Sequence, residues 1–208
     1  MAVTRKEEAY ALVKGQILDG TLKPGDIVSE RAFIQTLGYS RTPVHEAVTQ
    51  LAEEGLVKIM PSRGMVVAPI SVGDITMVYQ ARSVIEPAIV RLLAETRGLA
   101  VKDEVEEAMK RQMGDEDSAF HCALAQLAGN SYLLEMERKL MTQCQRIRVL
   151  SNKEDPAREA LARSEHQAIL EAIQQKEGGL ACKQVLHHLS RTVGDYQHIF
   201  STSTAIQL

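Results

Sequence analysis

Four side chains in the second half of the chain have the types and spacing of a metal site. Asp117 and His121 are four residues apart, so on a helix both point the same way. His166 lies in the middle of a helical apolar stripe, where a buried imidazole needs a partner. His188 lies on the inward flank of the last predicted helix. Three imidazoles and one carboxylate suit a borderline divalent ion such as zinc, nickel or manganese, with positions left for water or a ligand.

The two later histidines are predicted to face each other across an antiparallel helical hairpin. His166 is about nine residues before the turn at 175–179, and His188 is about eight residues after Leu180, so at a rise of ~1.5 Å per residue they end level. His187 points to the opposite side. The alternative is two unrelated buried histidines, each satisfied by backbone or carboxylate groups.

A second set of polar residues, near the N-terminus, could read DNA. Four residues lie on the side of a predicted helix away from its apolar residues: Arg41, Thr42, His45 and Glu46. Arg41 is the best candidate to donate two hydrogen bonds to guanine. Arg31 could clamp a phosphate or a base, and Arg63 could reach into a minor groove. The alternative is a solvated surface of a small α/β domain that contacts other proteins.

The first 70 residues contain the elements that would position these side chains. An apolar helical pattern ends at Gly20, and Ser29 can cap a short helix that stops at Gly38. A third helix can begin at Ser40 or Thr42. Two strand-prone runs, at 56–60 and 65–68, then flank a turn. Helix, helix-turn-helix and hairpin in this order predict a winged helix-turn-helix domain over residues 1–70.

The rest of the chain, residues 74–208, predicts an all-helical bundle, so the fold class is mostly α. Residues 69–73 are predicted to be the linker. Helical periodicity continues to the end of the chain and is broken mainly at glycines. The predicted helices lie at 74–96, 101–112, 116–128, 131–150, 157–175 and 179–198.

Composition limits what the chain can do. The 208 residues are 45% apolar and carry a net charge of −3, typical of a folded soluble protein without a broad positive field. Residues 1–70 carry 8 basic and 8 acidic side chains, so one copy should bind DNA weakly and a homodimer is expected. Three widely spaced cysteines suit a reducing cytoplasm. We expect neither a signal peptide nor a membrane span.

The segment SERAFIQTLGYSRTPVHEAVTQLAEEGLVKIMPSRGMVV resembles the DNA-binding domain of the GntR family of bacterial winged-helix regulators. The resemblance implies operator contacts from Arg31, Arg41 and a wing tip at Arg63 and Gly64. Our DNA-binding set also includes Ser40, Thr42 and His45. One position departs from the family, since His45 stands where arginine is usual. A histidine reaches less far and is mostly neutral at pH 7.

The segments DSAFHCALAQLAGN, SEHQAILEAI and VLHHL resemble the FCD effector domain of one large GntR subfamily. The resemblance implies that Asp117, His121, His166 and His188 bind the metal. It also implies that Arg82 meets a carboxylate effector, the alternative being an ordinary intrahelical pair with Glu86. The segment between Arg97 and Asp117 is shorter than usual, so one bundle helix is trimmed.

Together these features predict a transcriptional regulator, not an enzyme, that acts as a homodimer on a near-palindromic double-stranded operator. A small organic acid would complete the metal's coordination and meet Arg82. One alternative is a metal-dependent hydrolase, because three histidines and an aspartate can activate water, although no general base is evident beside them. Another is a helical interaction module with purely structural histidines.

Overall fold

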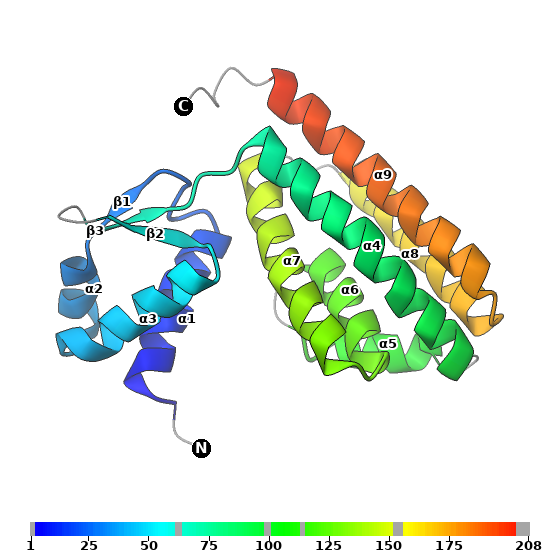
Figure 1. The fold of residues 1–208 in the computed structure, drawn as a ribbon, viewed down its shortest axis with the longest axis horizontal. Helices are drawn as coiled ribbons and strands as arrows, with labels where there is room; N and C mark the ends of the chain where they lie inside the picture. The colour runs from blue at the N-terminus through cyan, green and yellow to red at the C-terminus, as the bar shows by residue number, and fades with distance from the viewer. Residues whose placement is uncertain (1–2, 61–63, 98–100, 113–114, 152–155, 203–208) are drawn as a thin grey trace. The chain divides into compact units, whose positions relative to one another are not determined.

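The computed structural model describes residues 3–60, 64–97, 101–112, 115–151 and 156–202. The chain divides into two compact units, Met1–Ile70 and Ser71–Leu208, and each is taken by itself below. Both units are visible in Figure 1. Within the described residues, no helix has the length and apolar character needed to cross a membrane.

Three helices of the first unit follow the predicted order, and α2 has the predicted cap. Helix α1 spans Arg5–Leu18 and begins at a capping box in which Thr4 and Glu7 bond each other's backbone. Helix α2 spans Glu30–Leu37, between the Ser29 cap and Gly38, whose φ of 66° ends the helix. Helix α3 spans Arg41–Glu53 and buries Val44, Ala47, Val48 and Leu51.

A small antiparallel sheet completes this unit. Strands β2 (Val57–Met60) and β3 (Gly64–Val67) form the predicted hairpin, with Met60 opposite Gly64. Strand β1 (Ile27–Val28) pairs with the other side of β3, which gives the strand order β1-β3-β2. The sequence analysis missed β1, because two residues are too few to show strand alternation. The predicted winged helix-turn-helix fold is confirmed.

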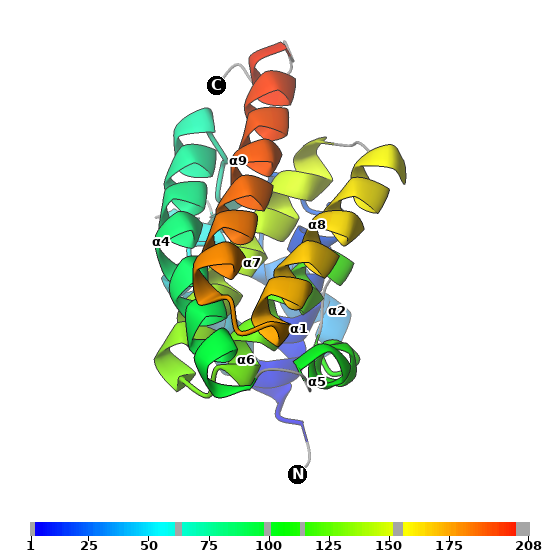
Figure 2. The ribbon, with the colours of Figure 1, turned by 90° about the vertical axis from the view of Figure 1, so that its right-hand side faces the viewer.

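The second unit is all-helical in its described residues, and its helices pack together as a bundle in Figures 1 and 2. Their bounds are α4 Val72–Thr96, α5 Val101–Met109, α6 Glu116–Leu127, α7 Ser131–Ser151, α8 Pro156–Gln174 and α9 Gly178–Thr202. Helix α4 begins two residues before the predicted start, because Ser71 and Asp74 form a capping box that draws the end of the expected linker into the helix. Helix α5 ends at Met109, three residues early.

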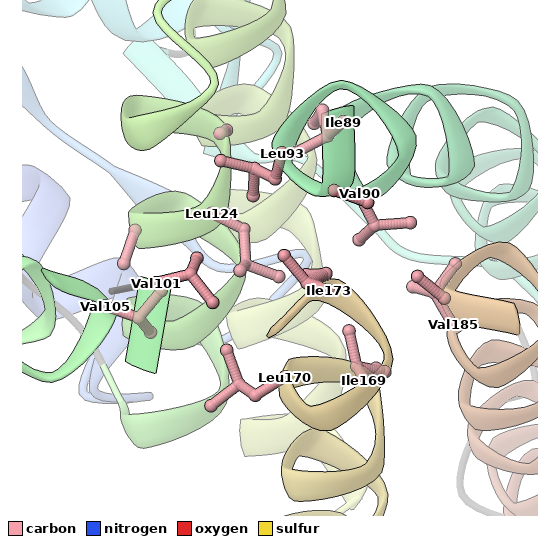
Figure 3. Packing of buried hydrophobic residues seen from close by; sticks show 14 of the residues in the cluster. Ile89, Val90, Leu93, Val101, Val105, Leu124, Ile169, Leu170, Ile173 and Val185 are labelled. Atoms are coloured by element: carbon pink, nitrogen blue, oxygen red, sulfur yellow. The ribbon is translucent and has the colours of Figure 1, made fainter. Parts of the chain in front are cut away.

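Helix α4 is the central element of the helical unit, in contact with α6, α7, α8 and α9. Aliphatic side chains from α4, α5, α6, α8 and α9 fill the space between the helices, as Figure 3 shows for Leu93, Leu124 and Ile173. One face of α4 is therefore covered by its neighbours, and polar residues on this inner face are buried. Arg82 and Glu86 are 0% and 3% exposed.

Candidate metal centre and DNA-reading helix

The structure brings the four predicted metal ligands together inside the helical unit. Helix α6 supplies Asp117 and His121, α8 supplies His166, and α9 supplies His188. One donor atom from each of the four lies within 4.8 Å of the others. Asp117 Oδ1 is 3.7 Å from His121 Nε2, 3.3 Å from His166 Nε2 and 3.6 Å from His188 Nε2. His187, in contrast, is exposed.

The Nε2 atoms of the three histidines are buried and make no hydrogen bond with any described residue. Three buried imidazole nitrogens that lack hydrogen bonds are costly unless something else, such as a metal ion, binds them. Ligands about 2.0–2.1 Å from a tetrahedral zinc ion are about 3.4 Å apart, close to the three oxygen–nitrogen separations. The donor set and its spacing therefore fit a divalent metal ion.

Carboxylates behind two of the histidines orient their rings. His188 Nδ1 is 2.7 Å from Glu165 Oε2, and His121 Nδ1 is 3.0 Å from Glu86 Oε2. At His188 the Glu165 carboxylate accepts a hydrogen bond from Nδ1, which leaves Nε2 free to bind a metal, whereas His121 and Glu86 form an ion-pair contact without hydrogen-bond geometry. His166 is fixed differently, since its ring stacks on that of Phe120 with centroids 3.9 Å apart.

Charges around the cluster keep Asp117 ionised. Burial would raise the pKa of this carboxyl group, but Arg148 and the three imidazoles hold it well below its usual value. Arg148 comes from α7 and donates from Nη1 to Asp117 Oδ2 at 2.7 Å. Its Nη2 also bonds Asp115, the residue that caps α6. An ionised carboxylate is the form that binds a metal.

Two of the histidines differ in protonation without a metal. Burial lowers the pKa of His166 to about 4, so this imidazole is neutral and ready to ligate at pH 7. Burial would also lower the pKa of His121, but the nearby Glu86 and Asp117 carboxylates raise it to about 9. His121 must therefore release a proton before a metal can bind.

Arg82 forms an ion pair with Glu86 on the same helix, which the sequence analysis gave as the alternative to binding a carboxylate effector. Its Nε donates to Glu86 Oε1 at 2.5 Å and its Nη1 contacts Cys144 Sγ at 3.5 Å. Arg82 Nη2 nevertheless has no hydrogen-bond partner among the described residues, and neither does the buried hydroxyl of Tyr79. The Tyr79 ring lies 5.0 Å from the Arg82 guanidinium carbon. Two buried donors thus remain available to a ligand.

A further buried carboxyl group was missed by the sequence analysis. Glu137 on α7 is 0% exposed, and neither of its oxygens has a hydrogen-bond partner among the described residues. One of its oxygens lies within 4.8 Å of donor atoms of Glu86 and His121. Burial and the negative Glu86 raise the pKa of Glu137 to about 8, so this group is mostly protonated at neutral pH.

In the first unit, the predicted DNA-reading residues lie together at the N-terminal end of α3. Ser40, Arg41, Thr42 and His45 are exposed there, and Arg31 is exposed in the first turn of α2. Ser40 begins the helix without a side-chain capping bond. Gly64 has a φ of 87° at the start of β3. Arg63, the predicted wing-tip contact, lies outside the described residues.

His45 is held by an acidic residue that the sequence analysis did not consider. Its Nδ1 lies 3.1 Å from Oε1 of Glu30, the first residue of α2. The His45 side chain is 52% exposed, whereas that of Glu30 is 19% exposed. The Glu30 carboxylate therefore contacts the ring at Nδ1, while about half of the His45 side chain remains exposed.

Of the residues that were missed, Arg148 and Glu137 carried a signal in the sequence. Both lie on the face of α7 that also carries Met141 and Cys144, since the four follow helical spacing. Charged residues that interrupt a buried stripe need partners in the interior, and this could have identified them. Glu165 next to His166 gave no such signal, because its neighbour His188 is distant in the sequence.

Comparison with known proteins gives matches in both units. Residues 5–67 match the model for bacterial regulatory proteins of the gntR family, and residues 77–191 match the FCD domain. An uncharacterised HTH-type transcriptional regulator of Bacillus subtilis, YdhC, is 27% identical over 205 residues, 91% of this chain and 90% of that protein. The HTH-type transcriptional repressor RspR of Escherichia coli is 27% identical over 194 residues, 88% of this chain and 85% of that protein.

Solved structures show the same fold. A transcriptional regulator from Rhodococcus sp. RHA1, described as a putative GntR protein, superimposes with a TM-score of 0.78 at 24% identity, covering 94% of this chain and 99% of that one. McbR/YncC of E. coli superimposes with a TM-score of 0.74 at 19% identity, covering 95% and 99% of the two chains.

Proposed function

The chain belongs to the GntR family of bacterial regulatory proteins and carries an FCD domain, and from that premise we propose a regulator whose helical unit binds a divalent metal ion and a small organic acid. As a member of these families it is a DNA-binding transcriptional regulator, not an enzyme. We propose that it acts in the cytoplasm, as a homodimer on a near-palindromic operator.

The observation that carries the metal proposal is the set of three buried Nε2 atoms around Asp117 Oδ1 that form no hydrogen bond within the described part of the chain. Asp117, His121, His166 and His188 would hold the ion, and Glu86 and Glu165 would orient two of the rings. Zinc suits this donor set best, with nickel and manganese as alternatives. When bound, the ion would supply a positive charge with coordination positions open to an anionic oxygen.

The effector proposal rests on the buried donors of α4. Arg82 Nη2 has no hydrogen bond to any described residue, and a carboxylate oxygen matches this nitrogen in charge and geometry. The pair between Arg82 and Glu86, and the contact of Glu86 with His121, connect this donor to the metal ligands. A small carboxylate that meets both the ion and Arg82 is therefore the proposed ligand. It would change DNA affinity only by preferring one state of the dimer.

For DNA contact we propose Arg31, Ser40, Arg41, Thr42, His45, Arg63 and Gly64. Exposure of the described members on α2 and α3, with the opposite face of α3 buried in its own unit, supports this assignment.

Exposed apolar residues support the homodimer proposal. Met77 and Val84 of α4 are 60% and 73% exposed, and Tyr132 and Met136 of α7 are 79% and 48% exposed. Each pair lies on one face of its helix, since the spacings are seven and four residues. Apolar side chains of this size would be covered by a second copy.

Val84→Glu combined with Tyr132→Glu should yield monomers in sedimentation analysis, and an unchanged mass would exclude these two faces as the dimer interface.

The metal and effector proposals are tested by elemental analysis together with a thermal-shift screen of small carboxylates. His188→Ala should lose bound metal, whereas His187→Ala, a change at the adjacent exposed residue, should keep it. An acid that stabilises the protein should lose its effect after chelation and in Arg82→Met. Metal content that is unchanged when His166 and His188 are replaced together would instead favour purely structural histidines.

A further inference from the structure

The pair formed by His45 and Glu30 determines which atom of the imidazole carries a proton. Glu30 lies in the first turn of α2, and its Oε1 is 3.1 Å from His45 Nδ1. An ionised carboxylate can only accept hydrogen bonds, so Nδ1 must be the donor. In a neutral imidazole the other nitrogen, Nε2, then carries a lone pair and can only accept.

The side chain that carries this accepting nitrogen is about half exposed. His45 is on the N-terminal turns of α3, next to exposed Arg41 and Thr42, and its side chain is 52% exposed. Val44 and Val48, its neighbours on the other side of the helix, are fully buried. A base edge that reaches this turn of α3 would therefore meet a hydrogen-bond acceptor.

We propose that His45, oriented by Glu30, is a specificity residue that reads an exocyclic amino group, the N4 of cytosine or the N6 of adenine, in each half-site. These amino groups are the donors that bases present in the major groove, whereas guanine presents acceptors at N7 and O6. An arginine at position 45 would do the reverse and donate to guanine. Glu30 is a positioning residue, since it acts through the ring of His45.

This inference rests on α3 being the DNA-reading helix, as proposed above. The full-length protein would first select its site from randomised duplex DNA at pH 8. Affinities for the four base pairs at each half-site position would then be measured for the wild type, His45→Ala, His45→Arg and Glu30→Gln.

At one position per half-site, the wild type should prefer adenine or cytosine over guanine by roughly 5- to 100-fold. His45→Ala should lose this preference, and His45→Arg should prefer guanine at the same position. Glu30→Gln should weaken it, because an amide can either donate to Nδ1 or accept from it. Preferences at the other positions should persist in all three variants.

Two results would overturn the inference. One is a wild-type preference for guanine that disappears in His45→Ala, and the other is a set of base preferences that no change at His45 alters. Arg41→Ala separates these from failure of the interface itself, because it should still change preference at a different position if α3 reads DNA. The ¹⁵N spectrum of the imidazoles, assigned by comparison with His45→Gln, should show the proton on Nδ1 of His45 in the free protein.

Discussion

Arg148 binds one carboxylate oxygen of Asp117, and the other oxygen lies near the three histidines. Arg148 Nη1 donates to Oδ2 at 2.7 Å, while Oδ1 faces the Nε2 atoms of the three histidines. Because Arg148 comes from α7 and Asp117 from α6, this ion pair fixes the carboxylate across two helices. Only one oxygen of Asp117 is then directed at the proposed ion.

Replacing Arg148 by methionine should weaken metal binding without removing a ligand. The carboxylate would lose the partner that orients it and lowers its pKa, and loss of such a partner typically costs 10- to 100-fold in metal affinity. Competition with a chelator of known affinity would measure the change. Arg163→Met is the matched control, since Arg163 on α8 pairs with the exposed Glu116, which precedes Asp117 on α6. Equal affinity in the wild type and Arg148→Met would show that the pair does not support the site.

Arg41→Ala should weaken operator binding by roughly 1–3 kcal/mol and relax base choice at one position per half-site. The reason is the loss of a planar donor from the exposed first turn of α3. Electrophoretic mobility shifts at fixed salt would measure it. Arg111→Ala, a change at an exposed arginine of the helical unit, should leave affinity unchanged. A loss below about 0.3 kcal/mol for Arg41→Ala would count against α3 as the reading helix.

Much of the fold could be predicted because its signals are local. The caps at Ser29 and Gly38, the apolar spacing along α3 and the glycine breaks between the later helices each define an element from a few neighbouring residues. Strand β1 could not be predicted in this way, because its two residues form a strand only by pairing with β3. The start of α4 was placed late because the capping box at Ser71 was overlooked.

The four clustered side chains of the candidate metal site could be anticipated from helix periodicity and the hairpin register of His166 and His188. The groups behind them could not, because each contact joins distant helices. Glu165 meets His188 across 23 residues, and Arg148 meets Asp117 across 31 residues. The burial of His121 was also underestimated, since helix counting placed it at the edge of the apolar face and the side chain is 1% exposed.

Gly64→Ala should destabilise the winged helix-turn-helix unit. Gly64 has a φ of 87°, and a Cβ there would lie 2.8 Å from the backbone oxygen of Val28. The strained backbone and the clash between β3 and β1 together should cost about 1–3 kcal/mol. Gly15→Ala is the control, because a Cβ at Gly15 meets nothing within 4 Å in α1. The control should be neutral or more stable in thermal unfolding, and equal melting of Gly64→Ala and the wild type would refute the clash.

Glu137→Gln should stabilise the metal-free helical unit at neutral pH and have little effect in acid. The folded-state pKa of Glu137 is about 8, against 4.5 for the ordinary group. Between these values the folded protein holds a proton that the unfolded chain has released, so wild-type stability falls as pH rises through this window. Glutamine does not titrate and avoids that penalty.

The gain for Glu137→Gln should be up to about 4 kcal/mol at pH 7.5 and less than about 0.5 kcal/mol at pH 4.5, as calorimetric unfolding at the two values would show. Glu135→Gln is the matched control, because Glu135 is on the same helix but exposed and paired with Lys139. That change should not stabilise the protein at pH 7.5. A gain for Glu137→Gln that is the same at both pH values would mean that packing, and not ionisation of the buried carboxyl group, determines the effect.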